Sequence, residues 1–473
     1  MRLGDLTRWF NLIEVHGLLY KTLENIVGPE NVSDKDFDLE AYTRDLSSAP
    51  EKRASFVVRP STTEQVSTIL RVANRYRIPV YVRGGGTSHW GEWLPVQGGI
   101  LMDMTSLNQI VEIDERGLTA TVQGGCTWFK LRNELKKLGL SCEPREMGGR
   151  AITVGASITK IGSGSIGVAK RGRLGWDVLG LEVVLPTGEI VKTAAVEYLG
   201  LRPFDSGGIG PNLTQFFIGS GGELGVITEA TLRVTPIPFD AYMYFDFPGL
   251  EDVEKVGDEV TRPVGDELAF HLEYSKTGGL SVGTGAESRV WTYGYTEKEL
   301  EFRCERIRDI CKKAGGREGD PKKTEVTHHR DHGYLWGGLT DYFEPGPVDY
   351  VGGYCPIYSL SRFFEVWEEV VVKKHGWTPP PKAGFGGWLI PRGWGVFGEF
   401  RYIDPDERPR IRETAEELTK RWFELGFMPW RLGDHLFLAK YSIPRLGGWY
   451  ELVKRLKKEL DPNDILNPGK MIR

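Results

Sequence analysis

The sequence predicts an α+β fold that is divided into at least two compact units. Between residues 56 and 235, short apolar segments typical of strands alternate with amphipathic helical patterns. From residue 239 to residue 435 the chain is richer in aromatic and charged residues and carries two long helical patterns. With 473 residues, of which 40% are hydrophobic, the chain is long enough to bury two or three cores.

The N-terminal half is expected to begin with a helix and to continue as alternating strands and helices. Residues 3–27 carry apolar side chains at helical spacing. A strand over residues 56–60 ends at a proline, and the helix that follows over residues 62–76 begins with residues that can cap it. Further strands are expected at residues 79–82, 99–103, 110–113 and 119–123, a helix at 127–137, a hairpin at 181–193 and a last strand within 216–235.

The C-terminal half is expected to contain helices at residues 297–314 and 409–426. A shorter helix over residues 449–460 leads into an ordered loop at residues 461–471, which is rich in Asp, Asn and Pro.

Three clusters of small residues, at residues 84–88, 148–167 and 219–227, favour a site for an extended ligand. Glycine lets a backbone approach phosphate oxygens closely and present successive N–H groups. Neither GxGxxG nor GxxxxGK[ST] occurs, which disfavours a Rossmann dinucleotide site and a nucleoside-triphosphate site. A loop-rich fold explains the clusters equally well on composition alone, since 60 of the 473 residues are glycine.

Composition narrows the classes of function. The net charge of −5 gives no support to nucleic-acid binding. The five cysteines form no CxxC motif, so neither a disulfide framework nor an iron–sulfur cluster is expected. The N-terminus does not resemble a signal peptide and no run of 18 apolar residues occurs, so we expect a cytoplasmic protein without a membrane span.

Several motifs occur in an order that resembles a known family. They are Val58–Val66, Arg83–Ser88, Leu101–Leu107, Thr153–Gly155, Leu179–Gly188, Gly219–Glu229 and Leu460–Lys470. Through them, residues 57–238 resemble the FAD-binding domain of the vanillyl-alcohol oxidase / p-cresol methylhydroxylase (PCMH) superfamily, and within it the branch of D-lactate dehydrogenases and glycolate oxidase FAD subunits.

The resemblance implies a two-subdomain, PCMH-type FAD-binding domain over residues 1–238, completed by the tail at residues 437–473. Residues 239–436 would form an α+β cap domain that covers the flavin ring and makes the substrate cavity. The implied activity is that of an FAD-dependent oxidoreductase, which takes a hydride from a CH–OH carbon.

The same resemblance implies where FAD is bound. The diphosphate would lie on the Arg83–Ser88 loop, with the flavin and the adenine on either side of it. The expected contacts are Arg83, Gly84, Gly85, Gly86, Thr87, Ser88, His89, Gly149, Thr153, Gly155, Ser157, Gly162, Gly172, Asp177, Gly225 and Ile227.

Two positions depart from the family pattern. Thr87 stands where members with a covalent flavin carry His in this loop, so we expect FAD to be bound non-covalently and not through His89. The usual Ser-Glu-Gly-Thr-Leu-Gly reads Ser220-Gly221-Gly222-Glu223-Leu224-Gly225, which leaves it open whether Glu223 replaces the displaced carboxylate.

Candidate catalytic residues come from the second half of the chain. His435, in Gly433-Asp434-His435, resembles the base of the 2-hydroxy acid enzymes, and a structural histidine is the equally good alternative. Arg392, Arg401 and Arg330 could bind a substrate carboxylate, although each could also be a surface or ion-pair arginine.

No metal site is expected. The 2-hydroxy acid enzymes that this chain resembles hold a divalent metal through two further His. The corresponding segment of this chain, Gly393–Tyr402, contains no His. The segment Thr327–His332 contains three His and one Asp, but neighbouring residues on a strand point to opposite faces, which favours a role without metal.

Three functions remain open at this stage. The first is dehydrogenation of a 2-hydroxy acid such as D-lactate or glycolate, with electrons passed to a quinone or a protein. The second is oxidation of a phenolic or sugar alcohol, which the aromatic residues at 377–402 favour. The third is an FAD subunit that docks to an electron-transfer flavoprotein or an iron–sulfur subunit; a homo-oligomer is compatible with all three.

Overall fold

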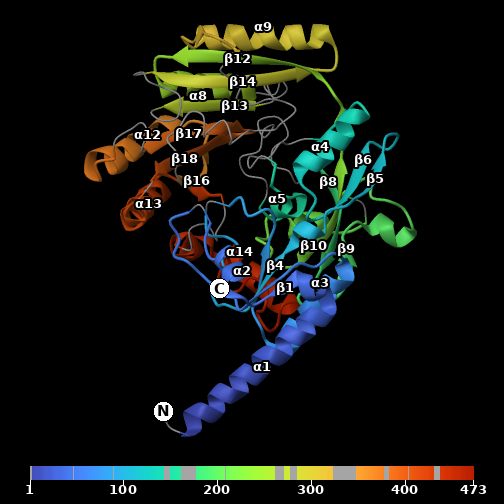
Figure 1. The fold of residues 1–473 in the computed structure, drawn as a ribbon. Helices are drawn as coiled ribbons and strands as arrows, with labels where there is room; N and C mark the ends of the chain where they lie inside the picture. The colour runs from blue at the N-terminus through green and yellow to red at the C-terminus, as the bar shows by residue number, and fades with distance from the viewer. Residues whose placement is uncertain are drawn as a thin grey trace.

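The computed structural model describes most of the chain. The described residues are 3–45, 47–88, 90–142, 150–160, 177–207, 209–261, 271–276, 285–322, 348–377, 383–402, 404–430 and 437–472. The fold is α+β, as the sequence predicts (Figure 1). Among the described residues, the N-terminal half has a four-stranded and a five-stranded sheet and a short pair of strands, β7 (Leu140–Ser141) with β11 (Thr235–Pro236), and the C-terminal half has one large sheet.

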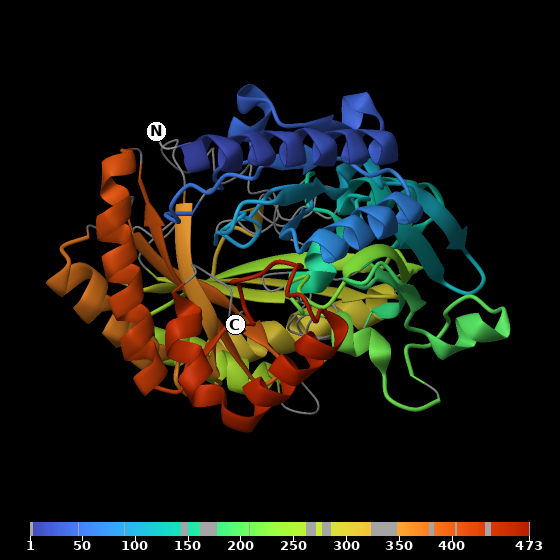
Figure 2. The same ribbon diagram turned by 90° about the horizontal axis from the view of Figure 1, so that it is seen from below.

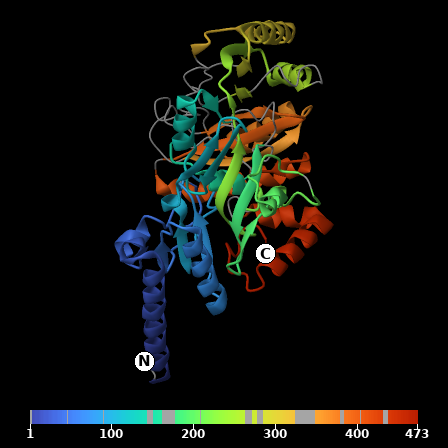
Figure 3. The same ribbon diagram turned by 90° about the vertical axis from the view of Figure 1, so that its right-hand side faces the viewer.

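The first sheet has the order β1 (Val32–Ser33), β2 (Phe56–Val58), β4 (Ile100–Asp103), β3 (Val80–Arg83), with β2 and β3 parallel to β4. Helix α3 (Thr63–Tyr76) packs on it through an apolar face, and the Thr62 side chain accepts a hydrogen bond from the N–H of Gln65, as expected for a cap. Helix α1 (Leu3–Val27) begins far from the body and ends beside α3 (Figures 1 and 3).

The second sheet is antiparallel and carries the remaining predicted strands of this half. Its order is β5 (Ile110–Asp114), β6 (Thr119–Gln123), β10 (Val226–Arg233), β8 (Val178–Val184), β9 (Ile190–Lys192). Helices α4 (Trp128–Lys137) and α5 (Val154–Lys160) contribute buried apolar residues to the core around it. The predicted hairpin is β8–β9, and its turn at Pro186–Glu189 is closed by a bond from Gly188 N to Leu185 O.

The third sheet contains eight antiparallel strands. In spatial order they are β15 (Arg317–Glu318), β12 (Phe239–Phe247), β14 (Ala286–Gly294), β13 (His271–Lys276), β17 (Ala383–Ile390), β18 (Gly393–Arg401), β16 (Val348–Pro356) and β19 (Met428–Pro429). Four helices pack against one face and enclose the largest apolar core: α8 (Leu250–Thr261), α9 (Glu297–Lys313), α12 (Leu360–Trp367) and α13 (Arg408–Glu424) (Figure 1).

The predicted helices at 297–314 and 409–426 are confirmed as α9 and α13, whereas α8 and α12 were not predicted. The predicted helix over residues 449–460 is confirmed as the second part of α14 (Leu438–Leu460), whereas the part before its kink was not predicted. Pro444 lies inside it and Gly447 has non-helical angles, so a kink interrupts the apolar periodicity. Seen from below, α14 lies beside both the large sheet and the strands of the N-terminal half (Figure 2).

The second face of the large sheet carries glycine and aromatic residues. Trp388 lies flat over its cross-strand neighbour Gly395, where an added Cβ would come within 2.9 Å of the indole. Trp430 covers Gly352 in the same way, at 2.2 Å. Within the described residues, no helix is both long and apolar enough to span a lipid bilayer.

We predict opposite effects for two Gly→Ala substitutions in helices. A Cβ at Gly257 in α8 would lie 2.2 Å from the buried Trp394 ring, so G257A should destabilise the fold by about 1–3 kcal/mol through overpacking. Gly17 in α1 has open space around it, so G17A should stabilise by about 0.5–1 kcal/mol. Urea unfolding of both variants measures this, and destabilisation of equal size would contradict the assigned packing of α8.

Candidate cofactor and active site

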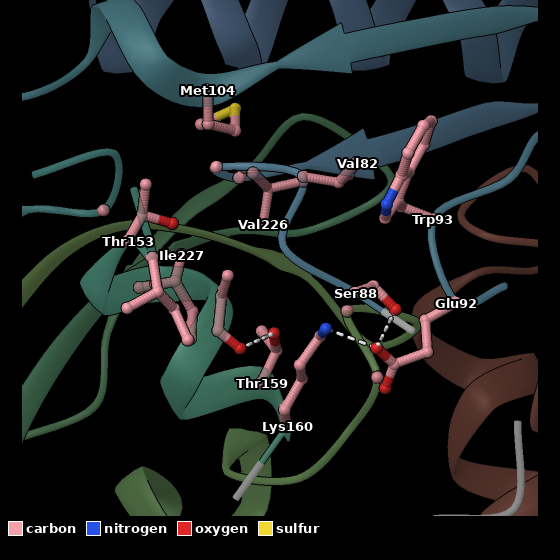
Figure 4. Close-up of a pocket in the computed structure, with 18 of the residues that line it drawn as sticks. Val82, Ser88, Glu92, Trp93, Met104, Thr153, Thr159, Lys160, Val226 and Ile227 are labelled. Carbon is pink, nitrogen blue, oxygen red and sulfur yellow. Dashed lines mark hydrogen bonds and ion pairs between the residues drawn. The ribbon is translucent and has the colours of Figure 1, made fainter. Parts of the chain in front are cut away.

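A pocket with about 800 Å³ of empty space, open solvent included, lies between the four- and five-stranded N-terminal sheets and the C-terminal tail. Its walls consist mainly of glycines and small hydroxyl-bearing residues, together with a few apolar side chains (Figure 4). The lining residues are Val82, Gly84, Gly85, Gly86, Thr87, Ser88, Glu92, Trp93, Met104, Gly124, Ile152, Thr153, Gly155, Ala156, Thr159, Lys160, Gly221, Gly222, Gly225, Val226, Ile227 and Asn467. All three predicted glycine clusters contribute backbone to this region, although part of the second lies outside the described residues.

The loop after β3 passes very close to the N-terminal end of α5. An added Cβ at Gly85 would lie 1.7 Å from the carbonyl oxygen of Ala151, and one at Gly84 would lie 2.3 Å from Thr153 Oγ1. Gly86 has a φ of 69°, a conformation that side chains disfavour. Only glycine at these positions therefore lets the loop and α5 enclose one narrow space.

Thr153 presents a buried polar atom at the wall of the cavity. Its side chain is 1% exposed, and its Oγ1 makes no hydrogen bond with any residue that the structure describes. A buried hydroxyl without a partner costs about 1–3 kcal/mol, so such groups are rare unless a ligand or water completes them. A phosphate or ribose oxygen of FAD is a suitable partner, and the residues present fit this cofactor.

Three side chains form a charged cluster at one end of the cavity. Glu92 Oε2 accepts a hydrogen bond of 2.8 Å from Ser88 Oγ and forms an ion pair with Lys160 Nζ. Figure 4 shows the three side chains pointing toward one another at the edge of the cavity. Within the described lining residues, Lys160 is the one cation and Glu92 the one anion.

The C-terminal tail closes the opposite side of the cavity. Asn467 Nδ2 donates to the carbonyl oxygens of Gly221 at 3.1 Å and Gly222 at 2.9 Å, and Asn467 Oδ1 accepts from Val82 N at 3.1 Å. One side chain thus joins the β3 strand, the loop before β10 and the tail. Asn467 has a φ of 48°, a conformation that asparagine tolerates better than most residues.

Glu223 binds this tail instead of facing the cavity. Its carboxylate accepts the backbone N–H of Met471 and, at 2.9 Å, that of Ile472. Burial raises the pKa of Glu223 to about 8, although the nearby charge of Lys457 and the two N–H donors act in the opposite direction. Glu223 is not among the lining residues, so the structure gives it a tail-anchoring position.

The predicted cofactor residues fall into three groups. Those that line the cavity are Gly84, Gly85, Gly86, Thr87, Ser88, Thr153, Gly155, Gly225 and Ile227. Those that the structure does not place in the lining are Arg83, which pairs with Asp103 at 3.0 Å, Ser157, which accepts a 2.8 Å hydrogen bond from Trp128 Nε1, and Asp177, which is buried just before β8. Those outside the described residues are His89, Gly149, Gly162 and Gly172.

Two of the predicted catalytic residues, Arg392 and Arg401, lie in the described part of the chain, and these two are far apart. Arg392 is exposed in the turn before β18, whereas Arg401 is buried at the far end of that strand, about 30 Å away at the rise of an extended chain. Arg401 forms an ion pair of 3.3 Å with Glu399. His435 and Arg330 lie outside the described residues, as does the Thr327–His332 cluster. Elsewhere in the described chain, no group of three or more His, Cys, Asp or Glu is arranged to hold a metal ion.

An aromatic cluster on the glycine-bearing face of the large sheet adjoins the charged end of the cavity. Trp90, which lies between Ser88 and Glu92 in sequence, donates from Nε1 to Tyr350 O at 3.2 Å. Its ring lies 5.7 Å from that of Trp430, edge to face. The buried members of the cluster are Tyr350, Tyr354, Trp388 and Trp430, with Trp90, Ile390 and Phe397 packed against them.

The structure adds functional candidates that sequence reasoning missed. Arg289, 5% exposed and paired with Glu287 at 3.1 Å, shares the sheet face of Trp388, two strands away. The alternation of charged and apolar residues along Ala286–Gly294 could have placed it on a strand face but not beside a site. Lys160, Glu92 and Asn467 were also missed, because their contacts join segments far apart in the sequence.

Comparisons with known proteins agree with this geometry. A family model described as FAD binding domain matches residues 54–194, and one described as FAD linked oxidases, C-terminal domain, matches residues 445–471. The chain is 33% identical to glycolate oxidase subunit GlcD of Bacillus subtilis, over 95% of each chain, and 32% identical to D-lactate dehydrogenase of Archaeoglobus fulgidus, over 90% of this chain and 93% of that one.

Two solved structures share the fold at low identity. A 4-ethylphenol oxidase from Gulosibacter chungangensis superposes with a TM-score of 0.82 at 20% identity, covering 97% of each chain. A p-cresol methylhydroxylase superposes with a TM-score of 0.80 at 18% identity, covering 100% of this chain and 97% of that one. At such identities the likeness concerns the fold alone, and it supports the PCMH-type arrangement.

We predict that T153V will weaken FAD binding and leave the apoprotein at least as stable. Valine keeps the shape of threonine and removes a hydroxyl that has no partner until the cofactor binds. The dissociation constant of FAD should rise about tenfold, the equivalent of one hydrogen bond. T121V is the matched control, because the Thr121 hydroxyl shares a buried 2.9 Å hydrogen bond with the Thr231 hydroxyl. This variant should destabilise both the apoprotein and the FAD-loaded protein. Unchanged FAD affinity in T153V would contradict the assignment.

We predict that ionisation of Glu223 contributes to the pH dependence of the free energy of unfolding. Its pKa in the folded protein, about 8, exceeds the ordinary value of 4.5, so its contribution to stability is fully present below pH 4.5 and is lost as the pH rises through about 8. E223Q carries no charge in either state, so its unfolding free energy should decline less than that of the wild type between these limits. Urea unfolding at pH 5 and pH 9 measures this, and equal declines would contradict it.

Proposed function

The chain belongs to the FAD-linked oxidoreductases of the D-lactate dehydrogenase and glycolate oxidase type, and from this membership we propose that it removes a hydride from the CH–OH carbon of a small 2-hydroxy acid. The proposal rests above all on a likeness to glycolate oxidase subunit GlcD that extends over 95% of both chains. The glycine-walled cavity, in which Thr153 has an unpartnered hydroxyl, supports the same cofactor independently.

The chain's own residues would hold FAD at the cavity. Backbone N–H groups of the Gly84–Ser88 loop and the Thr153 hydroxyl would contact its polar groups, and Asn467 would hold the tail over it. When bound, FAD supplies the acceptor for the hydride. The chain must then provide a base for the hydroxyl proton and a cation for the substrate carboxylate.

We assign the cation to a buried arginine on the aromatic face of the large sheet. Glu399 in β18 is the cross-strand partner of Tyr350 in β16. Arg401 lies two residues after Glu399 in β18. Arg401 therefore shares the sheet face of Tyr350, whose carbonyl oxygen accepts the hydrogen bond of Trp90. Arg289 is the second candidate on the same face. Guanidinium groups bind carboxylates through two parallel hydrogen bonds, which fixes the substrate's orientation. The exposed Arg392 is the weakest of the predicted arginines for this role.

The aromatic cluster supports a second candidate function. Trp388 and Trp430 stack at 5.5 Å with their rings 15° apart, and neither indole N–H has a hydrogen-bond partner in the described part of the chain. Such a wall suits a bulky or aromatic substrate, so a phenolic alcohol, or a 2-hydroxy acid with an aromatic side chain, is the alternative to lactate.

The electron acceptor is proposed to be a quinone or a protein. One relative is named as a subunit of a glycolate oxidase, which supports an FAD subunit that passes electrons to a partner. Slow reoxidation of the reduced flavin by air, together with co-purification of a flavoprotein or iron–sulfur protein, would support this. Rapid reoxidation with release of hydrogen peroxide would identify an oxidase instead.

We predict that anaerobic addition of a 2-hydroxy acid will bleach the flavin absorbance of the purified protein. The panel should contain D-lactate, L-lactate, glycolate, larger 2-hydroxy acids with apolar side chains, phenolic alcohols and sugars. Bleaching by one or more D-2-hydroxy acids supports the proposal, because hydride transfer reduces the ring directly. Bleaching by phenolic alcohols alone would favour the second candidate, and bleaching by none of the hydroxy acids would exclude the first.

We predict that H435A will slow bleaching by about 100-fold or more and retain FAD. Loss of a general base typically costs two to four orders of magnitude in rate. H375A is the matched control, because His375 pairs with Glu417 at 2.8 Å among helices of the outer layer and should leave the rate unchanged. An unaltered bleaching rate in H435A would remove His435 from the mechanism.

A further inference from the structure

The Ser88–Glu92–Lys160 cluster lies at the end of the cavity that meets the large sheet. Ser88 and Glu92 line the cavity, while Trp90 between them packs into the aromatic cluster of that sheet. Ser88 and Glu92 therefore touch the cofactor cavity, and Trp90 touches the proposed substrate face. This end is where a flavin ring would have to lie to meet a substrate.

The diphosphate, which is the other anionic part of FAD, would have ligands of its own. The glycine loop contacts the start of α5, where Gly84 lies against Thr153. Lys160 is the last residue of α5, seven residues after Thr153, or about 10 Å along a helix. A diphosphate bound at the Gly84–Thr153 contact would lie about that distance from the Lys160 backbone, so the lysine is better placed for the ring.

The ion pair holds the lysine in place at the cavity wall. The side chains of Lys160 and Glu92 are 21% and 14% exposed, so solvent screens the pair less than a surface pair. The Ser88 hydroxyl binds the same carboxylate oxygen, which further restricts Glu92. A lysine fixed in this way presents a positive charge to the cavity without the freedom of a surface side chain.

We propose that Lys160 supplies the positive charge that stabilises the reduced, anionic ring of FAD, and that Glu92 and Ser88 position it. Two-electron reduction adds negative charge to the ring, so a fixed cation nearby favours the reduced form and raises the midpoint potential. Glu92 partly offsets that charge. The pair therefore sets the potential through the balance of one cation and one anion. The inference rests on FAD being the cofactor and does not depend on which substrate is oxidised.

The test uses the FAD-loaded full chain and two measurements that need no substrate. The first is the dissociation constant of sulfite, which adds to oxidised flavins and leaves negative charge on the ring. The second is the midpoint potential, obtained by equilibration with reference dyes. K160M should weaken sulfite binding at least tenfold and lower the potential by about 30 mV, which is a tenfold change for a two-electron couple. K160R, which keeps the charge, should stay near the wild type.

Glu92 gives the decisive second variant because its expected effect has the opposite sign. E92Q leaves the lysine charge uncompensated, so sulfite should bind more tightly and the potential should rise. K137M is the matched control, since Lys137 forms an exposed pair with Glu134 and should change neither quantity.

Three results would overturn the proposal. The first is unchanged sulfite binding and potential in K160M. The second is a shift of both K160M and E92Q in the same direction, which would mean that the pair acts through structure alone. The third is a tenfold loss of FAD affinity in K160M with an unchanged potential in the loaded fraction, which would assign the lysine to the diphosphate. Absence of bleaching by any hydroxy acid would count against the proposed substrate only and would leave these measurements valid.

Discussion

The cofactor site depends on close backbone approach between segments that are far apart in the sequence. The loop at Gly84–Gly86 touches the start of α5 where no side chain would fit. Asn467, 385 residues after Val82, then joins that strand to the loop before β10. Because backbone groups make most of these contacts, the cavity offers many N–H groups and little side-chain volume, which suits a long polar dinucleotide.

Local patterns in the sequence were enough to predict much of the fold. The cap at Thr62, the proline after β2 and the turn at Pro186–Glu189 act within a few residues, so the corresponding elements were placed correctly. The part of α14 before its kink was not predicted, because Pro444 and Gly447 interrupt the helical pattern there. The glycine loop and Thr153 were recognised through family resemblance. A family motif reflects a backbone contact between distant segments, which the periodicity of apolar residues cannot reveal.

The site residues that escaped prediction act through long-range contacts. Nothing near Glu223 in the sequence indicates that its carboxylate binds the N–H groups of Met471 and Ile472. The pairing of Glu92 with Lys160 likewise joins a loop to the end of a helix 68 residues later. Arg401 was proposed from its residue type, but its burial and its distance from Arg392 follow only from the length of β18 and the helices around it.

The two faces of the large sheet are subject to different kinds of selective pressure. Along β17 and β18, one set of alternate residues packs under helices in the core, and the other set presents Trp388, Phe397 and Arg401 to the opposite side. Under the proposed function, a mutation in the first set affects whether the protein folds, and a mutation in the second affects which substrate it binds. The proposed recognition surface can therefore diversify during evolution while the scaffold beneath it stays the same.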